Sequence, residues 1–204
     1  MKRLLFTLSI FALIVSTSCK NDKKEDTEMK ESTEMKDSDM KKDNMKNDIN
    51  TSRETKEVKV ILEPKSDSQV KGTVLFSQED GVVTMMAMVS GLTEGTHAIH
   101  IHEKADCSSP DGKSTGGHWN PTNQPHGKWG SPNGYHKGDI GNLNANAQGN
   151  AKIVMSTDQW CIGCGDPNKD ILGHAIIVHE GTDDFKTQPT GDAGGRVSCG
   201  GIIK

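Results

Sequence analysis

HAIHIHE, residues 97–103, alternates apolar side chains with histidines, which predicts a strand of a β-sheet. Side chains two residues apart on a strand leave the same face, so His100 and His102 project together, whereas Ile99 and Ile101 point the opposite way, into the core. Such a strand can present two imidazoles to one metal ion while its isoleucines anchor it by packing. The stretch therefore predicts a β-structure that carries a metal site.

Short β-like runs recur on both sides of this strand. Glycine, asparagine, aspartate and proline separate them, and no convincing helical pattern occurs. Aromatic residues make up only 4% of the chain and glycine occurs 22 times, which favours short strands with many turns. These features predict an all-β sandwich or barrel. The expected strands are Val58–Leu62, Val70–Phe76, Val82–Val89, His97–His102, Ala151–Met155, His174–His179 and Gly200–Ile203.

The two longest irregular stretches are Glu103–Ile140 and Glu180–Gly195, and loops of that length in a compact domain are usually functional. The first holds three more histidines and a carboxylate, and His179 ends an apolar run just before the second. Three histidines with one carboxylate suit tetrahedral zinc, whereas four imidazoles suit copper. The candidate ligands are His100, His102, His118, His126, His136, Asp139 and His179.

The first nineteen residues predict an export signal. Two basic residues precede the apolar run Leu4–Val15, which is too short to span a bilayer core of about 30 Å. Small residues then lead into Cys19, as in the lipobox of bacterial lipoproteins, although Ser16 stands where leucine is usual. We expect residues 1–19 to be a lipoprotein-type signal peptide and Cys19 to be lipidated, which anchors the exported protein to a membrane of a bacterial cell envelope. The alternative is an ordinary signal peptide cut nearby, with Cys19 incidental.

Residues 20–57 are rich in charges of both signs and nearly free of apolar residues other than methionine. TEMKES (27–32) recurs as TEMKDS (33–38), and such a segment cannot bury enough surface to offset its ordering entropy. We therefore expect a disordered tether, followed by one domain over 58–204. A sharper alternative is that the methionine thioethers capture Cu(I), because soft ligands select that ion. The net charge of −4 and the absence of a basic cluster predict no nucleic-acid partner.

The chain has five cysteines, an odd number for an oxidising compartment. If Cys19 carries lipid, four remain, which is consistent with two disulfides. Cys161 and Cys164 could form a local disulfide, a metal clip or a redox pair, and we favour the disulfide.

The stretch from Val58 to Lys204 resembles the copper/zinc superoxide dismutase family. Several independent motifs occur in the family's order and near its spacing: GLTEGTHAIHIHE (91–103), GGHWNP (116–121), HG (126–127), HKGDIGN (136–142), ILGHAIIVHE (171–180) and GDAGGRVSCG (191–200). The resemblance implies an eight-stranded Greek-key β-barrel with two functional loops. It also implies an enzyme, with one copper and one zinc per chain, that converts superoxide to dioxygen and hydrogen peroxide. It leaves open whether the chain forms a homodimer.

The resemblance also implies a role for each site residue. Copper would be bound by His100, His102, His118 and His179, and zinc by His118, His126, His136 and Asp139. His118 would be the imidazolate shared by both metals and would deliver a proton. Arg196 would attract the anionic substrate, Asp183 would orient one histidine of each metal, and Cys107 would pair with Cys199. His97 and His174 fall outside the ligand set and are expected to be structural.

Two departures and two rival functions accompany this interpretation. Pro189 stands where some members carry a lysine that steers the substrate, and Asp192 replaces the more usual asparagine, so the approach to copper is less positive. One rival is a copper-delivery module on the same fold, which would be expected to lose a ligand or Arg196. The other is an adhesive or structural surface lipoprotein, which would have no use for seven aligned ligands.

Overall fold

The computed structural model describes residues 55–204. The predicted signal peptide, the lipidation site at Cys19 and the tether as far as residue 54 lie outside the described residues. The first strand begins at Lys56, two residues before the predicted start of the domain. None of the helices found within 55–204 has the length and apolar character needed to cross a membrane.

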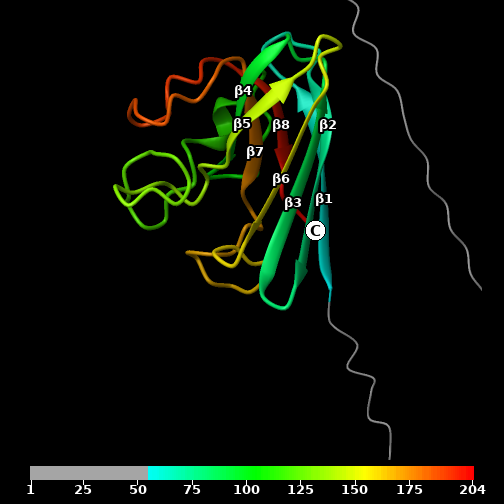
Figure 1. Ribbon diagram of the computed structural model, residues 1–204. Helices are drawn as coiled ribbons and strands as arrows, with labels where there is room; N and C mark the ends of the chain where they lie inside the picture. Colours follow the sequence, from blue (N-terminus) through cyan, green and yellow to red (C-terminus); the bar gives the residue numbers. More distant parts are fainter. Residues whose placement is uncertain (1–54) are drawn as a thin grey trace, which may run out of the picture. The chain divides into compact units, whose positions relative to one another are not determined.

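Eight antiparallel strands form the described part of the chain. Their order in the sheet is β5-β4-β7-β8-β1-β2-β3-β6, and β5 also contacts β6, so the sheet curls into a nearly closed barrel (Figure 1). The connections from β3 to β4 and from β6 to β7 each pass over two strands, as in a Greek key. The strands are β1 (Lys56–Pro64), β2 (Lys71–Glu79), β3 (Val82–Ser90), β4 (Gly95–His102), β5 (Gly141–Ala145), β6 (Ala151–Thr157), β7 (Ala175–His179) and β8 (Arg196–Gly201).

The barrel core follows from period-two patterning. In β1, Val58, Val60 and Leu62 are buried, and the residues between them are exposed. By contrast, every residue of β7 is buried, and so are the last six residues of β4. These neighbouring strands face the apolar core on one side, and on the other side their histidines meet the long loops. The metal-ligand candidates are therefore buried from both directions.

Two strands differ from the sequence prediction. β5 was not predicted, because Asn142 and Asn144 alternate with its buried Leu143 and Ala145, and asparagine is a poor strand former. β8 runs over Arg196–Gly201, whereas the prediction placed it at Gly200–Ile203. Its glycines and few apolar residues hide the strand, and the two isoleucines that suggested it lie beyond its end. The other six strands are confirmed, with ends shifted by no more than three residues.

The two long loops fall where they were predicted. The first connects β4 to β5 and contains only one short 3-10 turn, Lys113–Thr115, and the second connects β7 to β8. In Figure 1 both loops project from the side of the barrel that β4 and β7 form. This placement brings loop residues over the outward-facing histidines of those strands.

Residues 55–204 contain two disulfides, and both were expected. Cys107–Cys199 ties the first long loop to β8 with a sequence separation of 92, and its Cα atoms are 5.9 Å apart. Cys161–Cys164 closes a separation of only 3, in the loop between β6 and β7. In the chain-entropy model a disulfide stabilises the fold because it restricts the unfolded chain. This stabilisation is about 4–5 kcal/mol for the first disulfide and about 2 kcal/mol for the second. The long-range disulfide is therefore the main covalent brace of the barrel.

Candidate metal centre

Four histidines from three elements converge beside β4. His100 and His102 lie on β4, His179 ends β7, and His118 comes from the first long loop, where it forms an isolated β-bridge with His102. A β-bulge at Val178 and His179 alters the register with β8 at this point. One nitrogen from each of the four rings lies within 4.8 Å of the others, and all four residues are buried. This cluster matches a four-imidazole metal site.

A second cluster shares His118 with the first. It contains His118, His126, His136 and Asp139, all buried and all from the first long loop. Asp139 Oδ1 lies 2.9 Å from His118 Nδ1 and 3.2 Å from His136 Nδ1. Asp139 Oδ2 lies 3.0 Å from His126 Nδ1 and accepts hydrogen bonds from the backbone N–H groups of Gly127 and His136. Three imidazoles around one carboxylate form the donor set that suits zinc.

Unpartnered nitrogens test whether these clusters fit metal ions. Within 55–204, four buried side-chain nitrogens make no hydrogen bond of suitable geometry, and all four belong to the clusters: His100 Nδ1, His118 Nε2, and His126 Nδ1 and His136 Nδ1, which lie beside the Asp139 carboxylate without being aligned to it. An unpartnered buried polar atom is costly, and a metal ion would satisfy all of them. Because His118 Nδ1 faces Asp139, its Nε2 is left for the first cluster. The residues present therefore fit two metal ions joined through one imidazole.

Hydrogen bonds at the other ring nitrogens orient the ligands. Asp183 accepts from His100 Nε2 at 2.8 Å through one carboxylate oxygen and from His126 Nε2 at 2.9 Å through the other. His102 Nδ1 donates to the carbonyl oxygen of Gly116 at 3.0 Å. Such partners fix the tautomer and the orientation of a ligating ring. In each case the nitrogen that remains is the one that faces its cluster.

Burial sets the protonation of the first cluster. Burial holds the pKa of His100 below its usual value, and it lowers the pKa values of His102 and His179 further. Burial also outweighs the hydrogen bond with Asp139 and lowers the pKa of His118 to about 4. These four imidazoles are therefore neutral at pH 7, the form that binds a metal ion.

The carboxylates behave differently. Burial opposes the ionisation of Asp139, but its hydrogen bonds from the histidines outweigh burial and hold the pKa of this carboxyl well below its usual range. The pKa of Asp183 is lowered in the same way by His100 and His126. For His126 burial favours the neutral ring, but the two carboxylates prevail and raise its pKa to about 9. Metal-free His126 is thus cationic at pH 7.

Arg196, the first residue of β8, lies beside the first cluster. Its Nη1 donates to the carbonyl oxygen of Gly112 and to Thr115 Oγ1, both at 2.9 Å, and its Nη2 donates to the carbonyl oxygen of Gly116 at 2.8 Å. The carbonyl oxygen of Gly116 also accepts from His102, so one backbone group links the guanidinium to a candidate ligand. Arg196 is half-buried, which lowers its pKa, but a guanidinium stays charged in proteins.

The sequence did not point to three residues that support the clusters. Thr115 is buried and accepts a hydrogen bond from Arg196. Gln188 clamps the backbone of His126 by accepting from its N–H at 2.8 Å and donating to its carbonyl oxygen at 2.9 Å. Gly191 has φ +70°, and a Cβ there would overlap Asp183. These residues lie far from their partners in sequence or act through backbone atoms, so no local pattern marks them.

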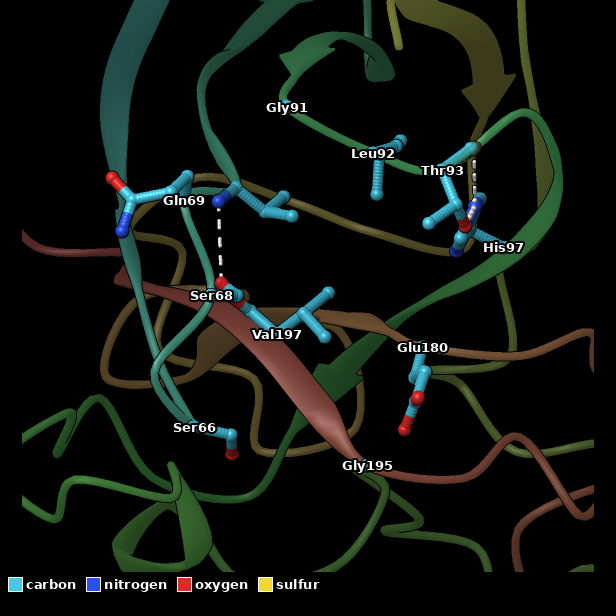
Figure 2. A pocket seen from close by; sticks show the side chains of 11 residues that line it. Ser66, Ser68, Gln69, Gly91, Leu92, Thr93, His97, Glu180, Gly195 and Val197 are labelled. Carbon is cyan, nitrogen blue, oxygen red and sulfur yellow. Dashed lines mark hydrogen bonds between the residues drawn. The ribbon is translucent and has the colours of Figure 1, made fainter.

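His97 and His174 lie outside both clusters. The Nδ1 of His97 is 3.1 Å from the carbonyl oxygen of His179, and its Nε2 is 2.9 Å from that of Thr93. His97 and Thr93 line a cavity of about 360 Å³ (Figure 2), and none of the metal-ligand candidates lines this cavity. His174 stacks on Trp119 with ring centroids 4.6 Å apart. Both rings make packing and backbone contacts, and His97 holds the main chain of a candidate ligand.

Comparison with known proteins supports the family assignment. The family model of copper/zinc superoxide dismutase matches residues 70–202. Among solved structures, a SOD-like protein from Bacillus subtilis is 32% identical over 71% of this chain and 97% of its own, with a TM-score of 0.63. A double mutant of a SOD-like protein from that organism is 34% identical, with a TM-score of 0.63 and coverage of 72% and 97%.

The clock protein EA4 is 33% identical over 72% of this chain and 94% of its own, with a TM-score of 0.62. The family match covers most of the barrel, including both histidine clusters and Arg196. By its sequence, its Greek-key barrel and its paired histidine clusters, this chain belongs to the copper/zinc superoxide dismutase family.

Proposed function

We propose that this protein dismutates superoxide to dioxygen and hydrogen peroxide. The observation that carries the proposal is the pair of buried clusters that share His118, with the Arg196 guanidinium beside one of them. A protein that only stores or delivers metal has no need for a fixed cation at this position. An enzyme with a small anionic substrate does.

We assign copper to His100, His102, His118 and His179, and zinc to His118, His126, His136 and Asp139. Support comes from the donor sets and from the unpartnered nitrogens in both clusters. Bound copper would supply one-electron redox chemistry that protein side chains do not provide. We propose one ion of each metal per chain.

The chain's own residues would bind the substrate and handle its proton. Arg196 is held by three hydrogen bonds, so its positive charge stays beside the first cluster and attracts an anion. His118 can hold a proton at Nε2, the atom that has no other partner, while Asp139 fixes the ring at Nδ1. Asp183 keeps His100 and His126 in their ligating tautomers.

We also propose that the protein acts in the cell envelope, anchored through Cys19, where it removes superoxide. Disulfides such as the two found here persist in extracellular or periplasmic compartments. The predicted signal and tether would place the domain outside the cytoplasmic membrane.

Reconstitution with copper and zinc tests the catalytic proposal. The full chain should bind one ion of each metal and accelerate the decay of superoxide, and removal of copper should abolish the activity. Metal content by mass spectrometry and superoxide consumption are measured on the same samples. A chain that binds both metals yet leaves superoxide decay unchanged would be a copper-delivery module instead.

Replacement of Arg196 by glutamine should lower the superoxide rate constant and leave the metal content unchanged. We expect a loss of about tenfold or more, within the range of about 10–10³ that focused charge adds to encounter rates, for which superoxide dismutases are themselves an example. Lys59→Gln, on the exposed side of β1, removes the same unit of charge and should have little effect. Arg196→Lys keeps the positive charge but loses the three hydrogen bonds that hold the guanidinium, so an intermediate rate constant is expected. Equal rates for both glutamine variants would refute the role of Arg196.

Zinc uptake by the metal-free protein should release a proton from His126. The pKa of about 9 means that this ring carries two protons at pH 7, and the proton at Nδ1 must leave before zinc binds there. Zinc affinity should therefore fall as the pH drops below about 9, and proton release should vanish above that pH. Calorimetry in buffers of different ionisation enthalpy measures the released protons. Equal release at pH 7.5 and pH 10 would contradict the prediction.

A further inference from the structure

The loop between β6 and β7 carries a third group of metal-binding side chains, separate from both histidine clusters. The Sγ atoms of Cys161 and Cys164 and a carboxylate oxygen of Asp170 all lie within 4.8 Å of one another. Cys161 is buried, Cys164 is exposed and Asp170 is half-buried. One sulfur of the disulfide is therefore open to a reagent in solution, and the other is shielded.

Hydrogen bonds hold this loop in addition to the disulfide. The N–H of Cys161 donates to the carbonyl oxygen of Lys169 at 2.8 Å, and the carbonyl oxygen of Cys161 accepts from Ile171 at 3.1 Å. Asp170 Oδ1 accepts from the backbone of Gly163 at 2.9 Å, and its Oδ2 accepts from that of Gly165 at 2.8 Å. These bonds bracket both cysteines, so reduction would leave two thiols close to their present positions.

Cys164 also has a hydrogen-bond donor that suits a thiolate. The backbone N–H of Asp166 lies 3.5 Å from its Sγ. An N–H directed at sulfur stabilises the anionic form, which is the form that binds metals. Exposure, a fixed backbone and this donor together prepare Cys164 to act as a ligand once the disulfide opens.

Of the two disulfides, this one is the more open to reduction. It closes a separation of only 3 residues, against 92 for Cys107–Cys199, so it stabilises the fold less, and by linkage the fold resists its reduction less. Cys199 is fully buried, whereas Cys164 is exposed. A dithiol reductant should therefore reach Cys161–Cys164 first.

The reduction balances with a dithiol as the electron donor. One thiolate of the reductant attacks Cys164 Sγ, the S–S bond breaks, and Cys161 leaves as a thiolate. The second thiol of the reductant then attacks its own sulfur in the mixed disulfide and releases Cys164. Two electrons pass to the cysteine pair, and the reductant leaves as a cyclic disulfide.

Reduction of the disulfide would make the loop between β6 and β7 more negative. Two thiolates would stand beside the carboxylate of Asp170, with Asp166 nearby, while the basic groups close to this loop include Lys204 Nζ, near Gly163, and His174, which acts on Asp170. A bound cation would offset this repulsion. Thiolates select soft ions, and the carboxylate already accepts three backbone N–H bonds, from Gly163, Gly165 and Leu172. Two strong sulfur donors with a weak third favour Cu(I), which accepts low coordination numbers.

We propose that Cys161 and Cys164, with Asp170 beside them, form a Cu(I) site that exists only when their disulfide is reduced. The site goes beyond the dismutase activity and does not depend on it. The disulfide form of Cys161 and Cys164 has no free thiolate and would not bind copper. The redox state of the surroundings would therefore decide whether this site holds copper.

Copper binding before and after mild reduction tests the proposal. The full chain, carrying Cys19→Ser so that no other unpaired cysteine remains, is first loaded with copper and zinc and then treated with a limiting dithiol. Alkylation with mass spectrometry should find two new thiols, at Cys161 and Cys164. Titration with Cu(I) against bicinchoninate should then show one more copper per chain than in the untreated protein, with a thiolate-to-copper charge-transfer band. Reoxidation should release it.

Cys161→Ser/Cys164→Ser, treated in the same way, is the matched control and should gain no copper. A reduced wild-type chain that binds no more Cu(I) than the oxidised chain would overturn the proposal. An equal gain in the serine variant would place the copper elsewhere, and alkylation at Cys107 and Cys199 first would show that this disulfide is not the labile one. Either result also rejects the site, and neither bears on superoxide decay.

Discussion

Asp139→Asn should lower the zinc affinity of the second cluster at least about 100-fold, since even groups that only orient a metal ligand are worth about 10–100-fold in affinity. The carboxylate contacts all three histidines of its cluster and accepts two backbone N–H bonds. An asparagine keeps the shape but loses the charge, and its amide nitrogen would face groups that also donate. Zinc content after dialysis against a chelator of known affinity measures the effect.

Asp67→Asn is the matched control for this substitution. Asp67 is exposed and has φ +57°, a conformation that asparagine tolerates well. It should leave zinc affinity unchanged. If Asp139→Asn retained zinc as tightly as this control, Asp139 could not be a ligand, and the assignment of the second cluster would fail.

Loss of the Cys107–Cys199 disulfide should produce the largest change in stability. Replacing both cysteines with alanine should lower the free energy of unfolding of the metal-free protein by about 4–5 kcal/mol in the chain-entropy model, because the bond closes a loop of about 90 residues. The same change frees the first long loop, whose Gly112 and Gly116 hold Arg196. Denaturant unfolding monitored by tryptophan fluorescence gives the free energy.

The second disulfide supplies the comparison. Cys161→Ala/Cys164→Ala removes the same number of sulfur atoms but opens a separation of only 3, so a loss of about 2 kcal/mol is expected. Equal losses in the two variants would show that loop closure is not what the long-range bond contributes.

Much of the barrel could be predicted from local pattern. In β1 the charged Lys59 separates the buried Val58 from the buried Val60, and in β4 isoleucines alternate with histidines, so the faces of these two strands are decided by the sequence itself. β5 and β8 could not be found this way. Their asparagines and glycines become strand residues because β4 and β7 offer unpaired edges to β5 and β8 respectively, which is a tertiary effect.

The candidate site also contains some residues that could be found from the sequence and others that only the structure reveals. The seven ligand candidates were found from histidine spacing and from motifs, because ligand chemistry restricts the residue type at each position. The structure brings all seven into the two expected clusters. The hydrogen bonds that hold Arg196 could not be predicted. Two of the three acceptors are backbone carbonyl oxygens, and the third is the side chain of Thr115, a residue type that marks no function by itself. Gln188 likewise acts through the main chain of His126.

Asp183 has a consequence for how the two metal positions communicate. One carboxylate holds a ring from each cluster, and His118 belongs to both, so the clusters are joined by two independent links. If both clusters bind metal, as we propose, an ion in one cluster would restrain His118 and, through Asp183, a ring of the other cluster. The second ion would then meet a more ordered donor set, which would favour positive cooperativity. By thermodynamic reciprocity the coupling is the same whichever ion arrives first.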